Sequence, residues 1–159
     1  MLLIINKPIS AVMVTVNSKW YPSQKLVSTQ ISGNADLQDI IQWKLSLIET
    51  LNQIPDNSEF KIYVNLYGFK AVNFEVHKVF RDVIPGTLLN YGWRVGYLDM
   101  FPEVSVKTNT TRNIQCKAAA HIHQDESKIK KYDELYSCET ERFFTDETVA
   151  KEWIDSFHL

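Results

Sequence analysis

The chain has 159 residues, of which 45% are hydrophobic and 23% are charged, and its formal net charge is −2. This size and composition are typical of a single globular domain with its own hydrophobic core, and the 12% aromatic content argues against disorder. Because lysine and arginine are not concentrated in any segment, we expect no nucleic-acid interface. We recognise neither a signal peptide nor an apolar run of the roughly 18 residues that a membrane span requires. We therefore expect one cytoplasmic domain over residues 1–159.

The N-terminal part of the chain predicts a hairpin. Residues 9–18 and 25–33 contain the alternating and β-branched residues that are typical of strands. The connection between them is short and contains Pro22, which restricts the backbone at a turn. The two strands are therefore predicted to pair antiparallel.

Residues 34–55 have the spacing of an amphipathic helix, with Asn34 as the expected N-cap and Pro55 beyond its end. The main apolar stripe repeats every three or four residues, and further apolar residues widen it. The stripe consists of Leu37, Ile41, Leu45, Ile48 and Leu51, widened by Ile40, Trp43 and Leu47. We predict that the whole stripe faces the core.

The remaining elements are predicted from similar patterns. Strands are expected at residues 59–69, 91–101, 114–123 and 140–144, and residues 102–113 are expected to form a polar loop. Helices are expected at residues 71–84, 125–136 and 145–157, the first ended by Pro85-Gly86 and the last capped by Thr145. This order predicts an α/β fold in which four helices pack on a single mixed, largely parallel sheet of about six strands.

The C-terminal quarter resembles a known group of domains. The segments "AAAHIHQD", "ERFFTD" and "VAKEWI", together with the order of elements, are similar to bacterial members of the STAS and SpoIIAA-like group. That group shares its layout with lipid-binding SEC14-type domains. The resemblance implies an α/β domain that regulates a protein partner or carries a small ligand.

One activity of the STAS group is not expected here. Anti-sigma-factor antagonists of that group carry a phosphorylated serine at the start of a helix, where free backbone N–H groups favour the phosphate. The corresponding junction in this chain is residues 65–75, and no serine or threonine occurs between Glu59 and Gly86. We therefore predict that the serine/threonine phosphorylation switch is absent.

The histidines of the "HIH" segment are the main candidates for a chemical site. His121 and His123 are two residues apart on a predicted strand, so they should share one face with Lys117 and Ala119. With Asp125 or Glu126, and with His77 from a helix, they could ligate zinc, although no third ligand has a fixed spacing. The favoured interpretation is the exposed end of a strand whose histidines bond the following turn, and no metal is assigned. As candidates for ligand or partner binding we name His121, His123, Asp125, Arg112 and Tyr132.

The sequence does not favour an enzyme, and we predict no catalytic residue and no cofactor. Cys116 is the obvious nucleophile, but its odd spacing from His121 on one strand predicts that the two side chains point to opposite faces. Neither cysteine belongs to a C-x-x-C pair, and both are expected to be reduced and buried. The chain has no glycine-rich phosphate loop and no G-x-S-x-G motif.

Three functions remain. The first is a non-catalytic module that binds a protein partner or a second copy of itself. The second is a carrier of a small apolar or anionic ligand, which requires a pocket larger than about 300 Å³. The third is a metal-dependent or acid–base enzyme at His121, His123 and Asp125, which requires both imidazoles to converge on a carboxylate.

Overall fold

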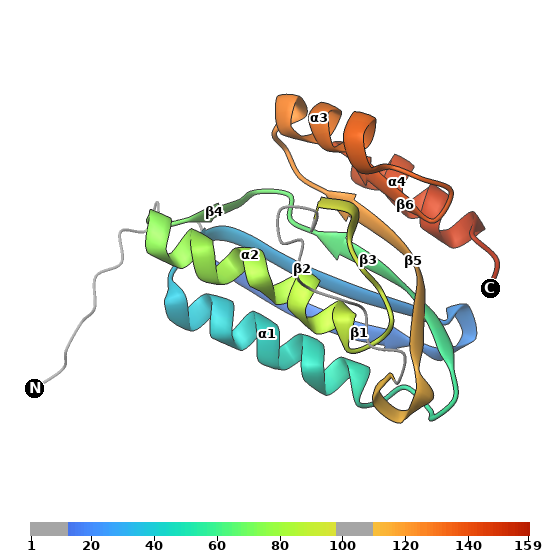
Figure 1. Ribbon diagram of the computed structural model, residues 1–159. Helices are drawn as coiled ribbons and strands as arrows, with labels where there is room; N and C mark the ends of the chain where they lie inside the picture. The colour runs from blue at the N-terminus through green and yellow to red at the C-terminus, as the bar shows by residue number, and fades with distance from the viewer. Residues whose placement is uncertain (1–12, 98–109) are drawn as a thin grey trace, which may run out of the picture.

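The computed structural model describes residues 13–97 and 110–159, which form a mixed α/β fold with a mostly parallel sheet (Figure 1). The strands of the main path are in the order β1-β2-β3-β5-β6, and β4 pairs with the far end of β2. The strands are β1 (Thr15–Tyr21), β2 (Leu26–Ala35), β3 (Glu59–Asn65), β4 (Phe69–Ala71), β5 (Gln115–Ile122) and β6 (Glu141–Phe144). The helices are α1 (Leu37–Leu51), α2 (Phe74–Leu89), α3 (Glu126–Tyr136) and α4 (Glu147–Ser156). The predicted fold class is confirmed.

The predicted hairpin is also confirmed. β1 and β2 pair antiparallel from Thr15↔Ser32 to Tyr21↔Leu26, and a short 3-10 turn at Pro22–Gln24 joins them. β1 begins and ends later than predicted, and residues 9–12 lie outside the described part. On one face of the hairpin, Ser18 and Thr29 share a hydrogen bond of 2.8 Å beneath α1. This pairing brings β1, β2 and α1 together at the edge of the sheet.

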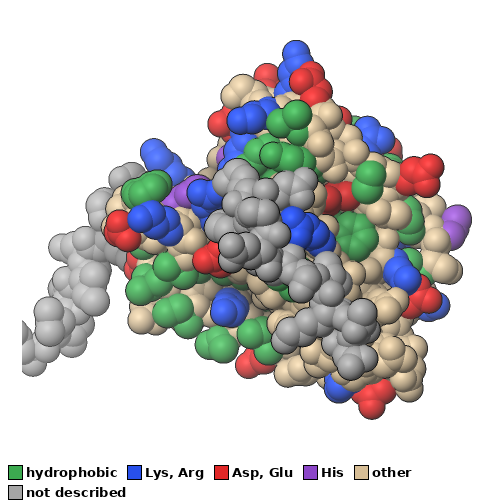
Figure 2. Space-filling model, viewed as in Figure 1, with side chains coloured by type: hydrophobic (Ala, Val, Ile, Leu, Met, Phe, Trp, Pro, Cys, Tyr) green, Lys and Arg blue, Asp and Glu red, His purple; other side chains and the backbone are tan. Residues whose placement is uncertain are grey.

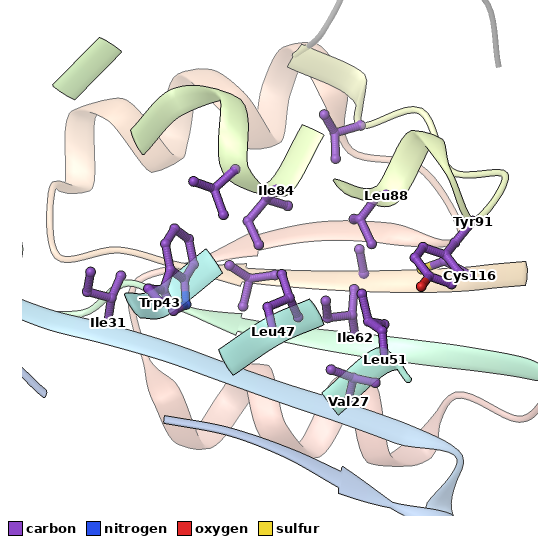
Figure 3. Packing of buried hydrophobic residues seen from close by; sticks show 14 of the residues in the cluster. Val27, Ile31, Trp43, Leu47, Leu51, Ile62, Ile84, Leu88, Tyr91 and Cys116 are labelled. Carbon is purple, nitrogen blue, oxygen red and sulfur yellow. The ribbon is translucent and has the colours of Figure 1, made fainter. Parts of the chain in front are cut away.

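Only part of the α1 stripe that the sequence pattern assigned to the core is buried. Ile40, Trp43 and Leu47 are fully buried, whereas Leu45 is 55% exposed. Leu37, Ile41 and Ile48 of the same row are also exposed, whereas Leu51 at its end is fully buried. Both rows have helical spacing, and only the seating of α1 on β1 and β2 chooses between them. Trp43 fixes this seating because its indole N–H donates to Thr29 Oγ1 at 2.8 Å in the buried interface. Figure 3 shows the resulting layer of side chains from β2, α1, α2 and β5.

The N-cap of α1 is Asp36 rather than Asn34. Its carboxylate accepts a hydrogen bond from the backbone N–H of Asp39 at 3.0 Å. The carboxylate of Asp39 in turn accepts a hydrogen bond from the backbone N–H of Asp36 at 2.9 Å. Asn34 instead lies at the end of β2. The predicted cap of α4 is likewise one residue early, since Asp146 rather than Thr145 accepts the free N–H groups of that helix.

Pro85 and Gly86 do not end the second helix, as the sequence predicted. α2 continues through them to Leu89. A proline inside a helix removes one backbone hydrogen bond and is normally unfavourable. Here Pro85, Ile84 and Leu88 are buried, the last two in the main core cluster, and this burial offsets the lost bond.

The predicted strand at residues 91–101 is wrong for its described part. Residues 91–97 form a turn and an irregular segment, and residues 98–101 lie outside the described part of the chain. Tyr91 pairs with β5 through one backbone bond only, from Cys116 N to Tyr91 O at 2.8 Å. The additional strand of the sheet is β4, of which only Phe69 was predicted to be in the third strand, while Ala71 was predicted to begin the following helix. Gly96 approaches α3 so closely that a Cβ atom there would lie 2.8 Å from Tyr136 Cβ.

A β-bulge in β5 changes which side chains share a face. Phe60 pairs with Cys116, but the next residue, Lys61, pairs with Ala118, so Lys117 is an extra residue in the strand. Cys116 therefore packs in the same core cluster as Ala119, on the α1 and α2 side of the sheet. The prediction that Cys116 and His121 point to opposite faces is wrong for this reason, because strict alternation from Ala119 places His121 on the same side.

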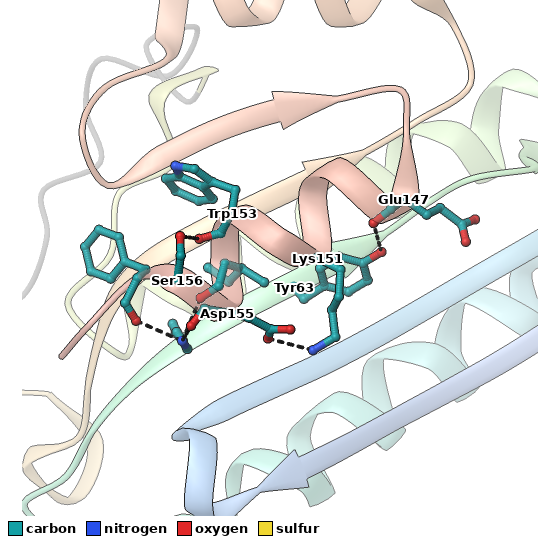
Figure 4. A network of polar contacts seen from close by, with 9 residues as sticks. Tyr63, Glu147, Lys151, Trp153, Asp155 and Ser156 are labelled. Atoms are coloured by element: carbon teal, nitrogen blue, oxygen red, sulfur yellow. Dashed lines mark hydrogen bonds and ion pairs between the residues drawn. The ribbon is translucent and has the colours of Figure 1, made fainter.

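The opposite face of the sheet is covered by α4. The small side chains of Ala118 and Ala120 let this helix pack closely through Ala150 and Ile154. Two side chains from β3 also reach the backbone of α4, and Figure 4 shows one of them, Tyr63, whose hydroxyl donates to the carbonyl of Glu147 at 3.4 Å. None of the helices in residues 13–97 and 110–159 is both long and apolar enough to cross a membrane.

Candidate functional site

A cavity of about 300 Å³ lies between α2 and α3, over the carboxyl ends of β5 and β6. In parallel sheets this edge is where ligands most often bind, because the loops and helix starts that follow the strands leave a crevice there. Its walls are mainly apolar and aromatic, with several nitrogen-bearing side chains. The lining residues are Trp43, Leu66, His77, Phe80, Arg81, Ile84, Pro85, Tyr97, His121, Ile122, His123, Lys128, Ile129, Tyr132 and Phe143.

The inner wall is built around the imidazole of His121. The ring stacks on Phe143 of the neighbouring strand, with centroids 4.8 Å apart and planes 12° apart. Tyr97 meets the same imidazole edge to face at 5.9 Å and stacks on Tyr132 of α3 at 5.5 Å. The pairing His121↔Phe143 places these two residues directly opposite each other on parallel strands. The aromatic contacts therefore fix the orientation of the imidazole.

Beneath this wall, His121 forms a buried pair with Glu141. His121 Nε2 lies 2.9 Å from Glu141 Oε2, and the two residues are 4% and 2% exposed. The other carboxylate oxygen accepts the backbone N–H of Gly96 at 2.8 Å. The interpretation of His121 as the exposed end of a strand is therefore wrong, because α3 and the 91–97 segment cover it.

The outer wall carries four nitrogen-bearing side chains, His77, Arg81, His123 and Lys128. Burial is the main cause that lowers the pKa values of His77, His123 and Lys128. These groups also lower one another's pKa values, since Lys128 acts on both histidines and Arg81 acts on His77 and Lys128. Asp125, which lines the adjoining groove, raises the pKa values of His123 and Lys128 and so offsets part of this mutual repulsion.

Beyond these side chains, the cavity continues into an open groove of about 590 Å³ beside the start of α2 and the start of α3. Gln124 shapes the groove by joining β4 to the end of β5: it accepts from Gly68 N at 2.8 Å and donates to Phe69 O at 3.1 Å. Asp125 caps α3 in the groove, with Oδ1 accepting from Lys128 N at 3.1 Å. The backbone N–H of Asp125 in turn donates to His123 Nδ1 at 3.0 Å.

The structure thus brings four of the five sequence candidates together, since His121, His123 and Tyr132 line the cavity and Asp125 lines the groove. Arg112 lies elsewhere and serves the fold. Its guanidinium donates to the carbonyls of Leu51 and Ile54 at 3.2 and 2.6 Å, just past the end of α1. It also forms an ion pair of 3.3 Å with Asp56.

The metal and nucleophile hypotheses find little support in the geometry. Within residues 13–97 and 110–159, no three histidine, cysteine or acidic side chains are grouped as metal ligands. His121 pairs with Glu141 rather than with Asp125, which instead caps α3. Cys116 is buried in the core, and burial raises the pKa of its thiol, which disfavours the reactive thiolate. The other cysteine, Cys138, is exposed, contrary to the prediction that both are buried.

Sequence reasoning missed Arg81, Lys128, Tyr97 and Glu141. Only Glu141 left a usable signal. The alternation in "ERFF" puts Glu141 on the same face of its strand as Phe143, and a carboxylate on a core-facing strand position needs a buried partner. The other three come from elements whose approach to one another depends on the tertiary packing.

Comparison with known proteins supports the fold alone. No family model matches this chain, and no curated protein matches it. A solved structure, that of an uncharacterized protein of the DUF3478 family with a SpoIIAA-like fold from Shewanella loihica PV-4, is similar to it with a TM-score of 0.52 and 15% sequence identity. The alignment covers 92% of this chain and 99% of that one. The chain therefore has a SpoIIAA-like fold.

Proposed function

We propose that this protein binds a small organic anion with an apolar body in the cavity between α2 and α3. The observation that carries the proposal is the composition of the cavity wall. Two cationic and three imidazole side chains line it together with apolar and aromatic groups, and no carboxylate is among its described lining residues. A ligand with one acidic group and a hydrophobic remainder matches both parts of that wall.

The size of the cavity narrows the class of ligand. About 300 Å³ reaches but does not exceed the volume that the carrier hypothesis requires, and it is at the lower end of the range for small-molecule sites, so the ligand is smaller than a typical drug. The acidic group is expected at the outer wall, near Arg81 and Lys128, and the apolar body against Phe80 and Tyr132. Lys128 already lies 5.7 Å from the ring centre of Tyr132. The carrier hypothesis drawn from the SEC14-type resemblance is thus the one that the geometry supports best.

The direct test is a binding panel of small carboxylates and phosphates, including phenylacetate, octanoate and phenyl phosphate. Binding to the folded state raises the free energy of unfolding, by about 2.7 kcal/mol at a hundred times the dissociation constant. We expect at least one aromatic or aliphatic acid to raise the unfolding midpoint, and calorimetric titration then gives its affinity. Arg81→Gln and Lys128→Gln are each expected to weaken binding by about tenfold.

The matched control is Lys131→Gln, which makes the same change of charge on an exposed position of α3 outside the cavity. Its affinity is expected to equal that of the wild type. An equal loss in all three variants would indicate diffuse attraction between charges rather than a site. A panel in which no acid binds would refute the proposal.

A second candidate function is self-association through α1, favoured by the exposed row Leu37, Ile41, Leu45 and Ile48. Figure 2 shows hydrophobic side chains gathered over the lower left of the molecule, where Figure 1 places α1. A straight ridge on one helix is self-complementary, since a two-fold axis can pack it against the same ridge of a second copy. This candidate keeps the hypothesis of a non-catalytic interaction module.

The oligomeric state in solution tests this candidate. We expect light scattering after size exclusion to give twice the mass of the chain and Leu45→Glu to give the monomer. Leu135→Glu is the control, because Leu135 is also exposed but lies on α3. A wild-type protein that stays monomeric at high micromolar concentration would eliminate self-association through α1.

A further inference from the structure

Most polar atoms of the group formed by His121, Glu141 and Gly96 at the inner wall of the cavity are hydrogen-bonded to one another. Glu141 Oε1 accepts a hydrogen bond from the backbone N–H of Gly96, and Glu141 Oε2 is hydrogen-bonded to His121 Nε2. Phe143 and Tyr97 prevent the imidazole from turning away. Among the described residues, neither His121 Nδ1 nor the hydroxyl of Tyr97 has a hydrogen-bond partner, and His121 lines the cavity. A nine-tenths buried imidazole in a cavity wall with one nitrogen left over is an incomplete polar arrangement.

A buried acidic group and imidazole are a poor means of gaining stability alone. Removing both from water costs as much as their attraction returns, unless every polar atom finds a partner. A carboxylate at Nε2 does, however, favour one tautomer of the neutral imidazole. It favours the tautomer with the proton on Nε2, and this leaves Nδ1 as a hydrogen-bond acceptor in the neutral imidazole.

We propose that His121, oriented by Glu141, accepts a hydrogen bond from a hydroxyl or N–H group at the inner end of the bound ligand. This inference rests on the proposed function, since it concerns the same cavity. It makes the ligand bifunctional, with an acidic group at Arg81 and Lys128 and a donor group that faces His121. Glu141 acts through His121 and is a positioning residue.

Recognition of this kind discriminates strongly between related ligands. A site that hydrogen-bonds a hydroxyl group disfavours the analogue without it, because a buried acceptor is then left unpaired. A purely apolar cavity gives the opposite preference, since the hydroxyl group would lose its hydration without compensation. The sign of the preference therefore separates a recognising His121 from a structural one.

The experiment compares 4-hydroxyphenylacetate with phenylacetate by calorimetric titration of the wild-type protein. We expect the hydroxylated acid to bind at least about tenfold more tightly. In His121→Phe, which keeps an aromatic ring against Phe143, we expect the ratio of the two affinities to fall to about one or below. Glu141→Gln is expected to reduce the ratio while keeping the cavity, because one amide cannot accept from both His121 and Gly96.

A measurement on the unmodified protein covers the case in which His121→Phe fails to fold with Glu141 unpaired. In protein labelled with ¹⁵N in its histidines, we expect 4-hydroxyphenylacetate to shift the Nδ1 signal of His121 and phenylacetate to leave it nearly unchanged. A donor group bound to any other residue would not give this difference.

The outcomes separate this inference from the proposed function. Equal affinities of the two acids, both reduced by Arg81→Gln, would refute the role of His121 and leave the anion site standing. A preference for the hydroxylated acid that persists in His121→Phe would assign the recognition to another residue. Absence of binding by both acids and by the rest of the panel would refute both proposals.

Discussion

Lys61 Nζ donates a hydrogen bond of 2.6 Å to the carbonyl oxygen of Ile154, near the end of α4. The same ammonium group donates to the carbonyl of Phe157 at 2.8 Å, so a buried lysine of β3 satisfies the free carbonyls that a helix leaves at its end. The positive charge also complements the negative end of the helix dipole. These bonds join α4 to the sheet by more than apolar packing.

The first prediction concerns this lysine. Lys61→Met keeps the apolar stem but leaves the carbonyls of α4 without their donor, and we expect the free energy of unfolding to fall by about 1–3 kcal/mol. Lys151→Met is the control, because Lys151 lies on α4 and forms an ion pair with Asp155 in which each side chain is 44% exposed. We expect its loss to stay below about 0.5 kcal/mol. Urea unfolding measures both, and equal losses would contradict the role of Lys61.

The second prediction tests which face of α1 is buried. Leu45 and Leu47 are two residues apart, and they are 55% and 0% exposed. Leu47→Ala should cost about 2–5 kcal/mol through lost burial and the cavity that remains, whereas Leu45→Ala should change stability by less than about 0.5 kcal/mol. Thermal and urea unfolding of the two variants give the comparison. Losses of similar size at the two positions would support the original prediction that the whole stripe faces the core.

The third prediction concerns the hydrogen bond between Trp43 and Thr29. Thr29→Val removes the acceptor of the buried indole N–H and also the partner of Ser18, and we expect a loss of about 1–3 kcal/mol. Trp43→Phe should cost less in the Thr29→Val background than in the wild type. A double-mutant cycle should therefore give a coupling free energy of about 0.5–3 kcal/mol. Additive losses would show that the bond contributes nothing to stability.

The fourth prediction concerns pH. Burial, followed by the nearby Lys128, lowers the pKa of His123, and its Nδ1 accepts a hydrogen bond that protonation would break. Below its ordinary pKa of about 6.5, the unfolded chain therefore takes up a proton that the folded chain does not. Stability should accordingly be greatest above about pH 6.5 and fall as the pH decreases toward 5.

The variant His123→Asn tests this dependence, because asparagine has an acceptor atom but does not titrate in this range. We expect the decrease in unfolding free energy between pH 7 and pH 5 to be smaller than in the wild type. It should not vanish, since the pKa of His77 is lowered as well and contributes with the same sign. Identical pH profiles of variant and wild type would show that His123 titrates alike in both states.

The sequence by itself determined the class of the fold and most of its elements. Alternation in β2 and β5 and the 3.6-residue period of α1, α3 and α4 are local properties, because they follow from side chains a few residues apart. The "HIH" segment likewise identified one wall of the candidate site. The absence of serine and threonine between Glu59 and Gly86 predicts, without any structure, that the serine/threonine phosphorylation switch is absent.

Only the tertiary structure decided the features that depend on contacts between distant segments. The seating of α1 on the hairpin chose between two apolar rows with the same period, and burial of Pro85 and its neighbours allowed α2 to continue past a residue that ends most helices. The bulge at Lys117 moved Cys116 to the other face, a change that no alternation rule includes. The cavity joins β5 to α2, α3 and the 91–97 segment, and His121 gained its partner Glu141 through parallel pairing of β5 with β6. Local patterns do not specify such pairings, because the energy that selects them comes from burial of the whole core.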